Sequence, residues 1–161
     1  MVAPALRSGW VVGDLEIIRV IAKAKQAADL HSSLIDQRAL SELLDSFDLK
    51  AHIATVSAEY HNRLLKLTDL IKSRQWEGID WVEPQGGMFM WVQLPEHIQA
   101  DVLLRHAVEA GVAFVPGQVF YPDGSGTNRI RVNFTHTDPR LLPEAVERLD
   151  RALRQYAAAG V

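Results

Sequence analysis

Hydrophobic residues recur every three or four positions along most of the first half of the chain. Residues 15–29 and 33–44 each carry an apolar stripe with charged residues beside it. This period places the apolar side chains on one face of an α-helix. A third such pattern runs from Lys50 to Ser73, which at about 1.5 Å per residue is roughly 36 Å of helix. A helix of that length often joins two bodies.

Capping residues stand before the first two helical patterns. Asp14 precedes the first pattern, and Ser33 precedes the second with Asp36 three residues further on. A short side chain with an oxygen acceptor can bind the free backbone N–H groups of the first helical turn. We therefore predict that Asp14 and Ser33 cap these two helices.

The pattern changes after Gly78. Alternating or short apolar runs predict three strands, at residues 88–94, 112–115 and 128–134. Two further helical patterns occupy residues 100–110 and the segment that starts at Asp138-Pro139. The lead at residues 81–87 is rich in turn residues. From Gly87 onward the order strand, helix, strand, strand, helix predicts a small two-layer α/β unit.

Two arginines are candidates for binding an anion. Alternation in residues 128–134 places Arg131 on the polar face of its predicted strand. Arg7 precedes Trp10-Val11-Val12, a short apolar run between glycines that predicts a buried strand. A fixed guanidinium is a planar, permanently charged fork that suits a carboxylate or phosphate. The alternatives are a solvated edge-strand arginine and a local salt bridge.

Composition narrows the function classes. The chain has 161 residues, 48% of them apolar, with a net charge of -3 and no cysteine. Disulfides, thiolate nucleophiles and cysteine-bound zinc are excluded. The negative net charge does not favour direct binding of nucleic acid. No apolar run is long enough to span a membrane. The first residues lack the order of a signal peptide, so we expect a cytoplasmic protein.

Other constellations have ordinary explanations. The six histidines are scattered, and none forms the i, i+4 pair of a helical metal site, so we expect no metal centre. Ser32 and Ser33 beside His31 could indicate a nucleophile. No Gly-x-Ser-x-Gly elbow accompanies them, and helix capping explains the serines better.

Four segments, taken in order, resemble landmarks of the class I/II, fold-type I pyridoxal-phosphate aminotransferases. They are Ala3–Val12 (Ala-Pro-Ala-Leu-Arg-Ser-Gly-Trp-Val-Val), Pro84–Trp91 (Pro-Gln-Gly-Gly-Met-Phe-Met-Trp), Val115–Phe120 (Val-Pro-Gly-x-x-Phe) and Asn128–Phe134 (Asn-x-Ile-Arg-Val-Asn-Phe). The sequences of these motifs are similar to those of the branch that contains 2-aminoadipate and kynurenine aminotransferases and aminotransferase-like regulators. The resemblance covers essentially the whole chain.

The resemblance implies roles for both arginines. Arg7 matches the residue that binds the phosphate of pyridoxal 5'-phosphate, and Arg131 matches the residue that pairs with the substrate's α-carboxylate. The implied reaction is amino transfer between an amino acid and a 2-oxo acid, with the cofactor ring as electron sink. The Schiff-base lysine would stand just before Met1, and Lys23 and Lys25 do not match it. We therefore assign no catalytic residue and expect this piece alone to be inactive.

The resemblance also implies a domain division. Residues 1–47 match a remnant of the large domain, 48–78 a linking helix and 79–161 the small carboxyl-terminal domain. The apolar faces of the first helices lead us to expect a homodimer. Two alternatives remain open at this stage, namely the effector-sensing half of a transcriptional regulator and a non-catalytic remnant that only oligomerises.

Overall fold

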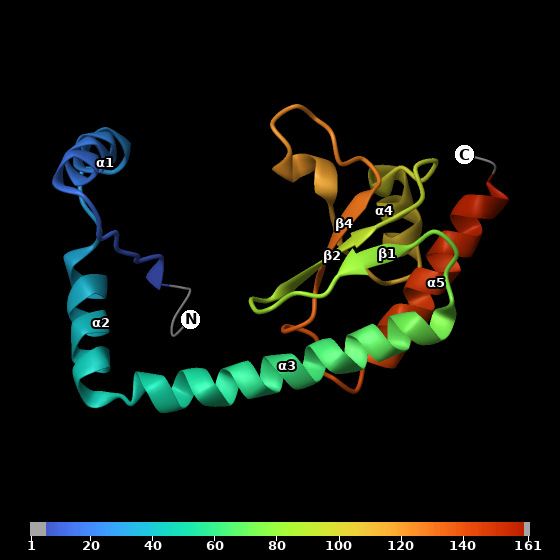
Figure 1. Ribbon diagram of the computed structural model, residues 1–161, viewed down its shortest axis with the longest axis horizontal. Coiled ribbons are helices and arrows are strands. Elements are labelled where there is room, and N and C mark those ends of the chain that lie inside the picture. The colour runs from blue at the N-terminus through green and yellow to red at the C-terminus, as the bar shows by residue number, and fades with distance from the viewer. Residues whose placement is uncertain (1–5, 160–161) are drawn as a thin grey trace. The chain divides into compact units, whose positions relative to one another are not determined.

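The computed structural model describes residues 6–159, and the chain divides into two compact units. The division lies between Thr55 and Val56, within the long helix α3 (Leu49–Arg74). Figure 1 shows the elements of both units along the chain. The helix predicted from Lys50 to Ser73 is thus confirmed almost to the residue.

The first unit holds two capped helices, α1 (Leu15–Ala28) and α2 (Leu34–Ser46). The side chain of Asp14 accepts a hydrogen bond from the backbone N–H of Glu16 at 2.8 Å. The hydroxyl of Ser33 accepts one from the backbone N–H of Asp36 at 3.3 Å. Both predicted caps are confirmed, because each satisfies a donor that the first helical turn leaves free.

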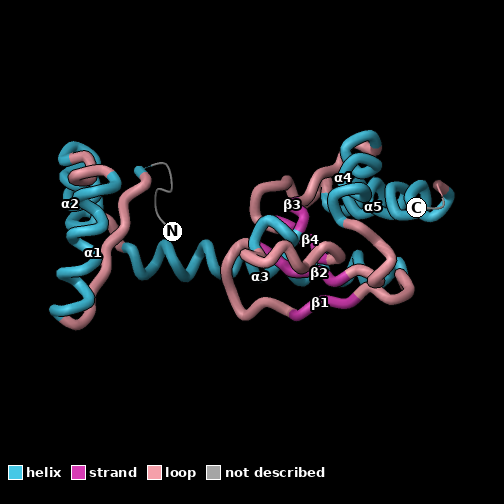
Figure 2. The backbone as a smooth tube through the Cα atoms, turned by 90° about the horizontal axis from the view of Figure 1, so that it is seen from above, coloured by secondary structure: helices cyan, strands magenta, loops and turns pink. Residues whose placement is uncertain are grey.

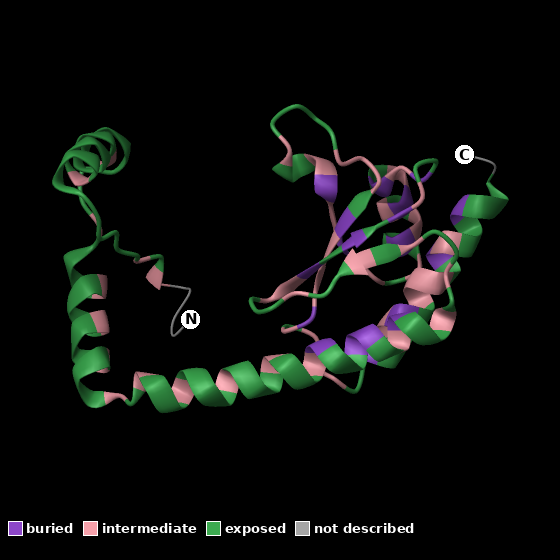
Figure 3. Cartoon of the chain, viewed as in Figure 1, coloured by how far each residue is buried: buried purple, intermediate pink, exposed green. Residues whose placement is uncertain are grey.

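No residue between positions 6 and 55 is buried (Figure 3). The buried strand predicted at Trp10-Val11-Val12 is wrong, since these residues form no strand and Trp10 and Val12 are 75% and 90% exposed. A three-residue strand needs a neighbouring strand for its backbone groups and a packed layer for its side chains. The first unit offers this segment neither among its described residues.

The second unit is built on a four-stranded antiparallel sheet. Its strands are β1 (Asp80–Val82), β2 (Phe89–Gln93), β3 (Val115–Pro116) and β4 (Arg129–Asn133), in the order β1-β2-β4-β3. Figure 2 shows the strands side by side in this order. The register pairs Trp91 of β2 and Val115 of β3 with Arg131 of β4. Strands from three of the four sequence motifs are therefore adjacent in space.

Two strand predictions differ from the structure. β1 overlaps the turn-rich lead at residues 81–87, where we predicted no strand, and pairing with β2 stabilises it. β3 is shorter and later than the predicted strand at residues 112–115. Val112 instead donates its backbone N–H to Ala107 at the end of helix α4 (Ala100–Glu109), after Gly111 in a left-handed conformation.

The last helix, α5 (Leu142–Ala158), begins later than predicted. Asp138 does not start it, because its side chain accepts a hydrogen bond from the backbone N–H of Arg140 at 2.9 Å. Its carbonyl also accepts from Leu141 at 2.8 Å, which closes a separate turn. The segment 138–141 is thus a turn before the helix.

One face of the sheet carries the hydrophobic core of the second unit. The last turns of α3, together with α4 and α5, cover this face with buried residues that include Leu67, Leu103, Val146 and Tyr156. Polar contacts fix the layers. Arg63 of α3 donates to the carbonyl of Thr135 at 2.6 Å, and the indole N–H of Trp76 donates to Asp150 of α5 at 2.7 Å.

The predicted two-layer α/β unit is confirmed by this packing of helices on one side of an antiparallel sheet. The mixed α/β class predicted for the chain is also confirmed. None of the helices between residues 6 and 159 combines the length and the apolar character that crossing a membrane requires.

Candidate functional site

The helices of the second unit leave the other face of the sheet uncovered, and this face carries aromatic side chains and an arginine. The alternation of β2 and β4 places Met90, Val92, Ile130 and Val132 on the core side. Phe89, Trp91 and Arg131 lie on the opposite side, where Trp91 is 37% exposed. The sequence prediction for the two faces of β4 is confirmed.

Arg131 lies between two phenyl rings on this open face. Its guanidinium carbon is 4.0 Å from the ring centroid of Phe89 and 4.4 Å from that of Phe120. Trp91 packs edge-on against Phe120, with ring centroids 5.3 Å apart. Phe89 belongs to β2, whereas Phe120 ends the short 3-10 helix η2 (Gly117–Phe120) that follows β3. Because β4 lies between β2 and β3, one ring approaches Arg131 from the side of β2 and the other from the side of β3.

The charge of Arg131 is not compensated within the described residues. Its Nε is buried and has no hydrogen-bond acceptor among them. Five ion pairs join side chains in the described part of the chain, and Arg131 takes part in none. A partly buried cation without a partner is unfavourable, so an incoming anion at this position would be stabilised.

Gly117 lets η2 approach β4 closely enough to bring Phe120 to Arg131. A Cβ atom at Gly117 would lie 2.7 Å from Cβ of Arg129 and 2.9 Å from the carbonyl oxygen of Gly126. Both distances are shorter than real Cβ contacts allow. The motif Val115–Phe120 therefore needs glycine at position 117, because any side chain there would collide with β4 or with Gly126. From the sequence we identified the motif but not this steric requirement.

Asn133 shapes the end of β4. Its side-chain oxygen accepts hydrogen bonds from the backbone N–H groups of Thr135 at 2.7 Å and His136 at 3.0 Å. This Asx turn redirects the chain after the strand. The sequence motif Asn128–Phe134 includes Asn133, but we assigned it no role from the sequence. The signal was present, because asparagine at a strand end often makes such a turn.

Arg7, the second predicted site residue, lies in the first unit. It is exposed, has a φ of 51°, and takes part in no ion pair among the described residues. The hydroxyl of Ser8 donates to the carbonyl of Leu6 at 3.2 Å and supports this turn. Ala3, Pro4 and Ala5 of the same motif lie outside the described residues. An exposed guanidinium without an internal partner fits a phosphate dianion.

The serines beside His31 have structural partners. Ser33 caps α2, and Ser32 accepts a hydrogen bond from the ammonium of Lys25 at 3.0 Å. Lys25 also pairs with Asp29 at 2.8 Å. Its charge is therefore already used within the first unit, and the geometry gives no support for a nucleophilic serine.

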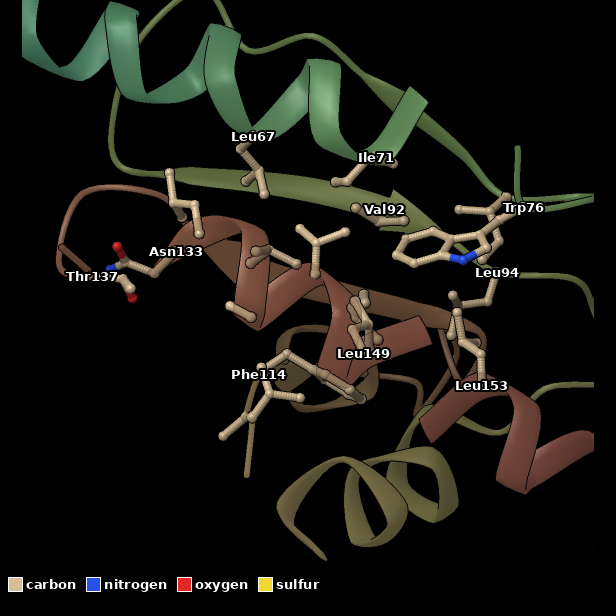
Figure 4. A pocket seen from close by; sticks show the side chains of 18 of the residues that line it. Leu67, Ile71, Trp76, Val92, Leu94, Phe114, Asn133, Thr137, Leu149 and Leu153 are labelled. Carbon is tan, nitrogen blue, oxygen red and sulfur yellow. The ribbon is translucent and has the colours of Figure 1, made fainter. Parts of the chain in front are cut away.

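A cavity of about 280 Å³ lies in the second unit between α3, the sheet and α5. Figure 4 shows Leu67 and Ile71 pointing into it from α3, and Leu149 and Leu153 pointing into it from α5. Among the residues that line it, His136 is the one with an ionisable side chain. The cavity is therefore a gap in the packing of an apolar layer rather than a place for acid–base chemistry.

Comparison with known proteins identifies the family. The model of aminotransferase class I and II matches residues 1–149. Aromatic-amino-acid aminotransferase 1 of Thermococcus litoralis is 31% identical over 96% of this chain and 37% of its own length. The solved α-aminoadipate aminotransferase LysN of Thermus thermophilus, complexed with N-(5'-phosphopyridoxyl)-L-leucine, is 32% identical with a TM-score of 0.89.

LysN is matched over 98% of this chain and 40% of the solved chain. The kynurenine aminotransferase of Pyrococcus horikoshii, solved with PMP, is 36% identical with a TM-score of 0.86, over 96% of this chain and 38% of that one. This chain thus spans less than half the length of each of these relatives. By the extent of the family match, the chain belongs to the class I and II aminotransferases.

Proposed function

We propose that this chain contributes to a pyridoxal-phosphate-dependent aminotransferase, in which Arg131 binds the α-carboxylate of an amino acid or 2-oxo acid. The observation that carries the proposal is the uncompensated guanidinium of Arg131 between Phe89 and Phe120 on the open face of the sheet. The aminotransferases named above are 31–36% identical to this chain, whereas two HTH-type transcriptional regulators of Bacillus subtilis are 24% and 25% identical, which favours the enzyme over the effector-sensing half of a regulator.

The role of Arg131 is binding and orientation. A carboxylate presents two oxygens in a plane, and a guanidinium offers parallel N–H donors that match them. A rigid strand holds the donor, so a bound substrate is oriented before any chemistry starts. The proposed contact uses the N–H donors of the guanidinium, so its contribution is to position the substrate and not to transfer a proton.

Arg7 would bind the phosphate of the cofactor. Its exposed guanidinium in the turn before α1 supports this assignment. When bound, pyridoxal phosphate supplies an electron sink for amino transfer. The contribution of Arg7 would be to bind the phosphate, which is distinct from the substrate contact at Arg131.

We further propose that the protein is a homodimer. The support is the exposed apolar surface of the first unit, where Val20, Leu34 and Ile35 are 68%, 67% and 81% exposed. Apolar patches of this kind mark association surfaces. A second copy of the chain is the partner that fits the family.

A titration of labelled arginine side chains tests the carboxylate site. Pyruvate added to the chain labelled with ¹⁵N-arginine is expected to move the Nε–H resonance of Arg131 in a saturable way. The Arg131→Gln variant should lose this binding. The matched control Arg129→Gln, on the same strand and face, should retain it, because Arg129 is exposed and bonded to Tyr121.

The proposal fails if pyruvate leaves the Arg131 resonance unmoved up to concentrations at which it perturbs other arginines. It fails equally if Arg129→Gln abolishes binding and Arg131→Gln does not. Inorganic chloride at the same ionic strength controls for general screening of charge.

A further inference from the structure

The two phenyl rings around Arg131 hold its guanidinium without neutralising its charge, which a neighbouring carboxylate would do. Phe89 and Phe120 approach its guanidinium carbon at 4.0 and 4.4 Å, distances at which a cation is attracted to the face of an aromatic ring. They come from segments distant in the sequence, on the two sides of β4. The guanidinium is therefore held by contacts that leave its positive charge in place.

From this geometry we infer that Phe89 and Phe120 are positioning residues, which clamp the guanidinium of Arg131 and leave its terminal Nη donors, rather than the buried Nε, for a carboxylate arriving in the guanidinium plane. The inference rests on the proposed function, because it concerns how Arg131 is prepared for its substrate. An arginine side chain that is free to rotate loses rotamer entropy when it is fixed. The clamp removes much of that loss before the carboxylate binds.

An internal carboxylate would also fix the side chain, but it would occupy the N–H donors and neutralise the charge. Arg63 and Arg148 illustrate that arrangement, since each pairs with a glutamate four residues earlier on its own helix at 2.7 Å. Arg131 has no such partner among the described residues, and its Nε has no acceptor. Aromatic contacts hold the cation and leave its hydrogen-bonding edge unused.

The surroundings of Phe120 indicate that its ring is itself held in place. Trp91 packs against it at an interplanar angle of 84°, a favourable edge-to-face arrangement. Gly117 allows η2 to lie directly on β4, which brings the segment that carries Phe120 beside Arg131. Three aromatic residues and a glycine thus determine the orientation of one arginine.

The clamp is tested with the same pyruvate titration in the variants Phe89→Leu and Phe120→Leu. Each keeps an apolar side chain but removes the ring, and we expect pyruvate to bind about fivefold more weakly. The two rings predict an upfield ring-current shift of the Nε–H resonance of Arg131 in the parent chain without pyruvate, and each leucine variant should reduce it. Phe120→Tyr keeps the ring and should restore both affinity and chemical shift. Val119→Ala, a change at a 65% exposed neighbour in η2, is the matched control and should leave both unchanged.

The outcomes separate the two proposals. Normal pyruvate affinity in both leucine variants, with an unmoved Arg131 resonance, overturns the clamp and leaves the carboxylate site standing. A parent chain that binds no pyruvate overturns the carboxylate site, and the ring-current shift then decides the clamp alone. Amide spectra and near-ultraviolet circular dichroism establish that each variant is folded. A leucine variant that does not fold is replaced by Phe120→Met or Phe89→Met, which also removes the ring; weaker pyruvate binding then supports the clamp and parental affinity overturns it.

Discussion

The two units of the chain use the same kind of helix with opposite results. In the first unit, α1 carries Ile17 and Ile21 on an apolar stripe, yet these residues are 58% and 40% exposed. In the second unit, α5 carries Val146 and Tyr156 on such a stripe, and they are 3% and 1% exposed. An amphipathic pattern and a cap are sufficient to specify a helix, but they do not specify what covers it.

Sheet pairing accounts for the difference. The second unit has a four-stranded sheet whose inner face the helices can cover, and this creates a buried layer. The first unit has no strand among its described residues, so its helices have no such layer to cover. The comparison implies that stability is concentrated in the second unit, and that apolar residues in the first unit are available for association.

The largest expected effect is a truncation in the core of the second unit. Leu103→Ala removes a fully buried side chain of α4, and we expect the free energy of unfolding of the second unit to fall by about 3 kcal/mol. Leu34→Ala makes the same chemical change in α2, where the side chain is 67% exposed. It should change that free energy by less than about 0.5 kcal/mol. Urea unfolding followed by tryptophan fluorescence measures both values.

The same pair of variants tests the homodimer. Leu34→Ala should raise the dissociation constant for self-association, as measured by sedimentation velocity. Leu103→Ala should leave this constant unchanged at temperatures where the variant is folded. A Leu34→Ala variant as unstable as Leu103→Ala, at every protein concentration, would show that the first unit has a core of its own and would break the comparison.

Local features of the fold could be predicted from the sequence, because their causes lie within a few residues. The caps at Asp14 and Ser33 and the left-handed Gly111 are of this kind. β4 was also predictable, since strict alternation determines both of its faces. β1 and the exposed segment at Trp10 were not, because a short strand exists only where a partner strand pairs with it.

The candidate site divides in the same way. Alternation and the motif identified Arg131 as an anion-binding candidate, but its aromatic contacts depend on the pairing of β2, β4 and β3. Phe120 reaches Arg131 only because Gly117 permits a close approach of two backbones. Such long-range contacts have no signature in the order of the residues. The role of Arg7 as a phosphate ligand remains a prediction from the resemblance.

An intermediate effect is expected from filling the cavity of the second unit. Ala145 of α5 lines this cavity, and Ala145→Leu adds a larger apolar side chain to it. We expect the free energy of unfolding to rise by about 1 kcal/mol, because the added carbons gain contacts without displacing buried ones. Ala158→Leu, at an exposed position at the end of α5, is the control and should have less than half this effect. Destabilisation by Ala145→Leu would show that the layer is already tightly packed there.

The smallest expected effect concerns the turn before α5. A side-chain hydrogen bond from Arg140 lowers the pKa of Asp138 from 3.8 to about 2, with further help from the backbone N–H of Arg140. A carboxyl group whose pKa is depressed in the folded state contributes stability above pH 3.8, and this contribution is lost as the pH falls toward 2. Both side chains are solvent-accessible, so the contribution to stability is small.

Arg140→Gln should return the pKa of Asp138 toward its ordinary value, as measured by the ¹³C chemical shift of the carboxyl group during an acid titration. Asp123 is the internal control, because its lowered pKa depends on hydrogen bonds from Ser125. An unchanged titration of Asp138 in Arg140→Gln would show that the turn's backbone alone depresses its pKa. The turn would then depend only on hydrogen bonds between residues close in the sequence. The helix caps of the first unit are of this kind, because they form without a packed layer.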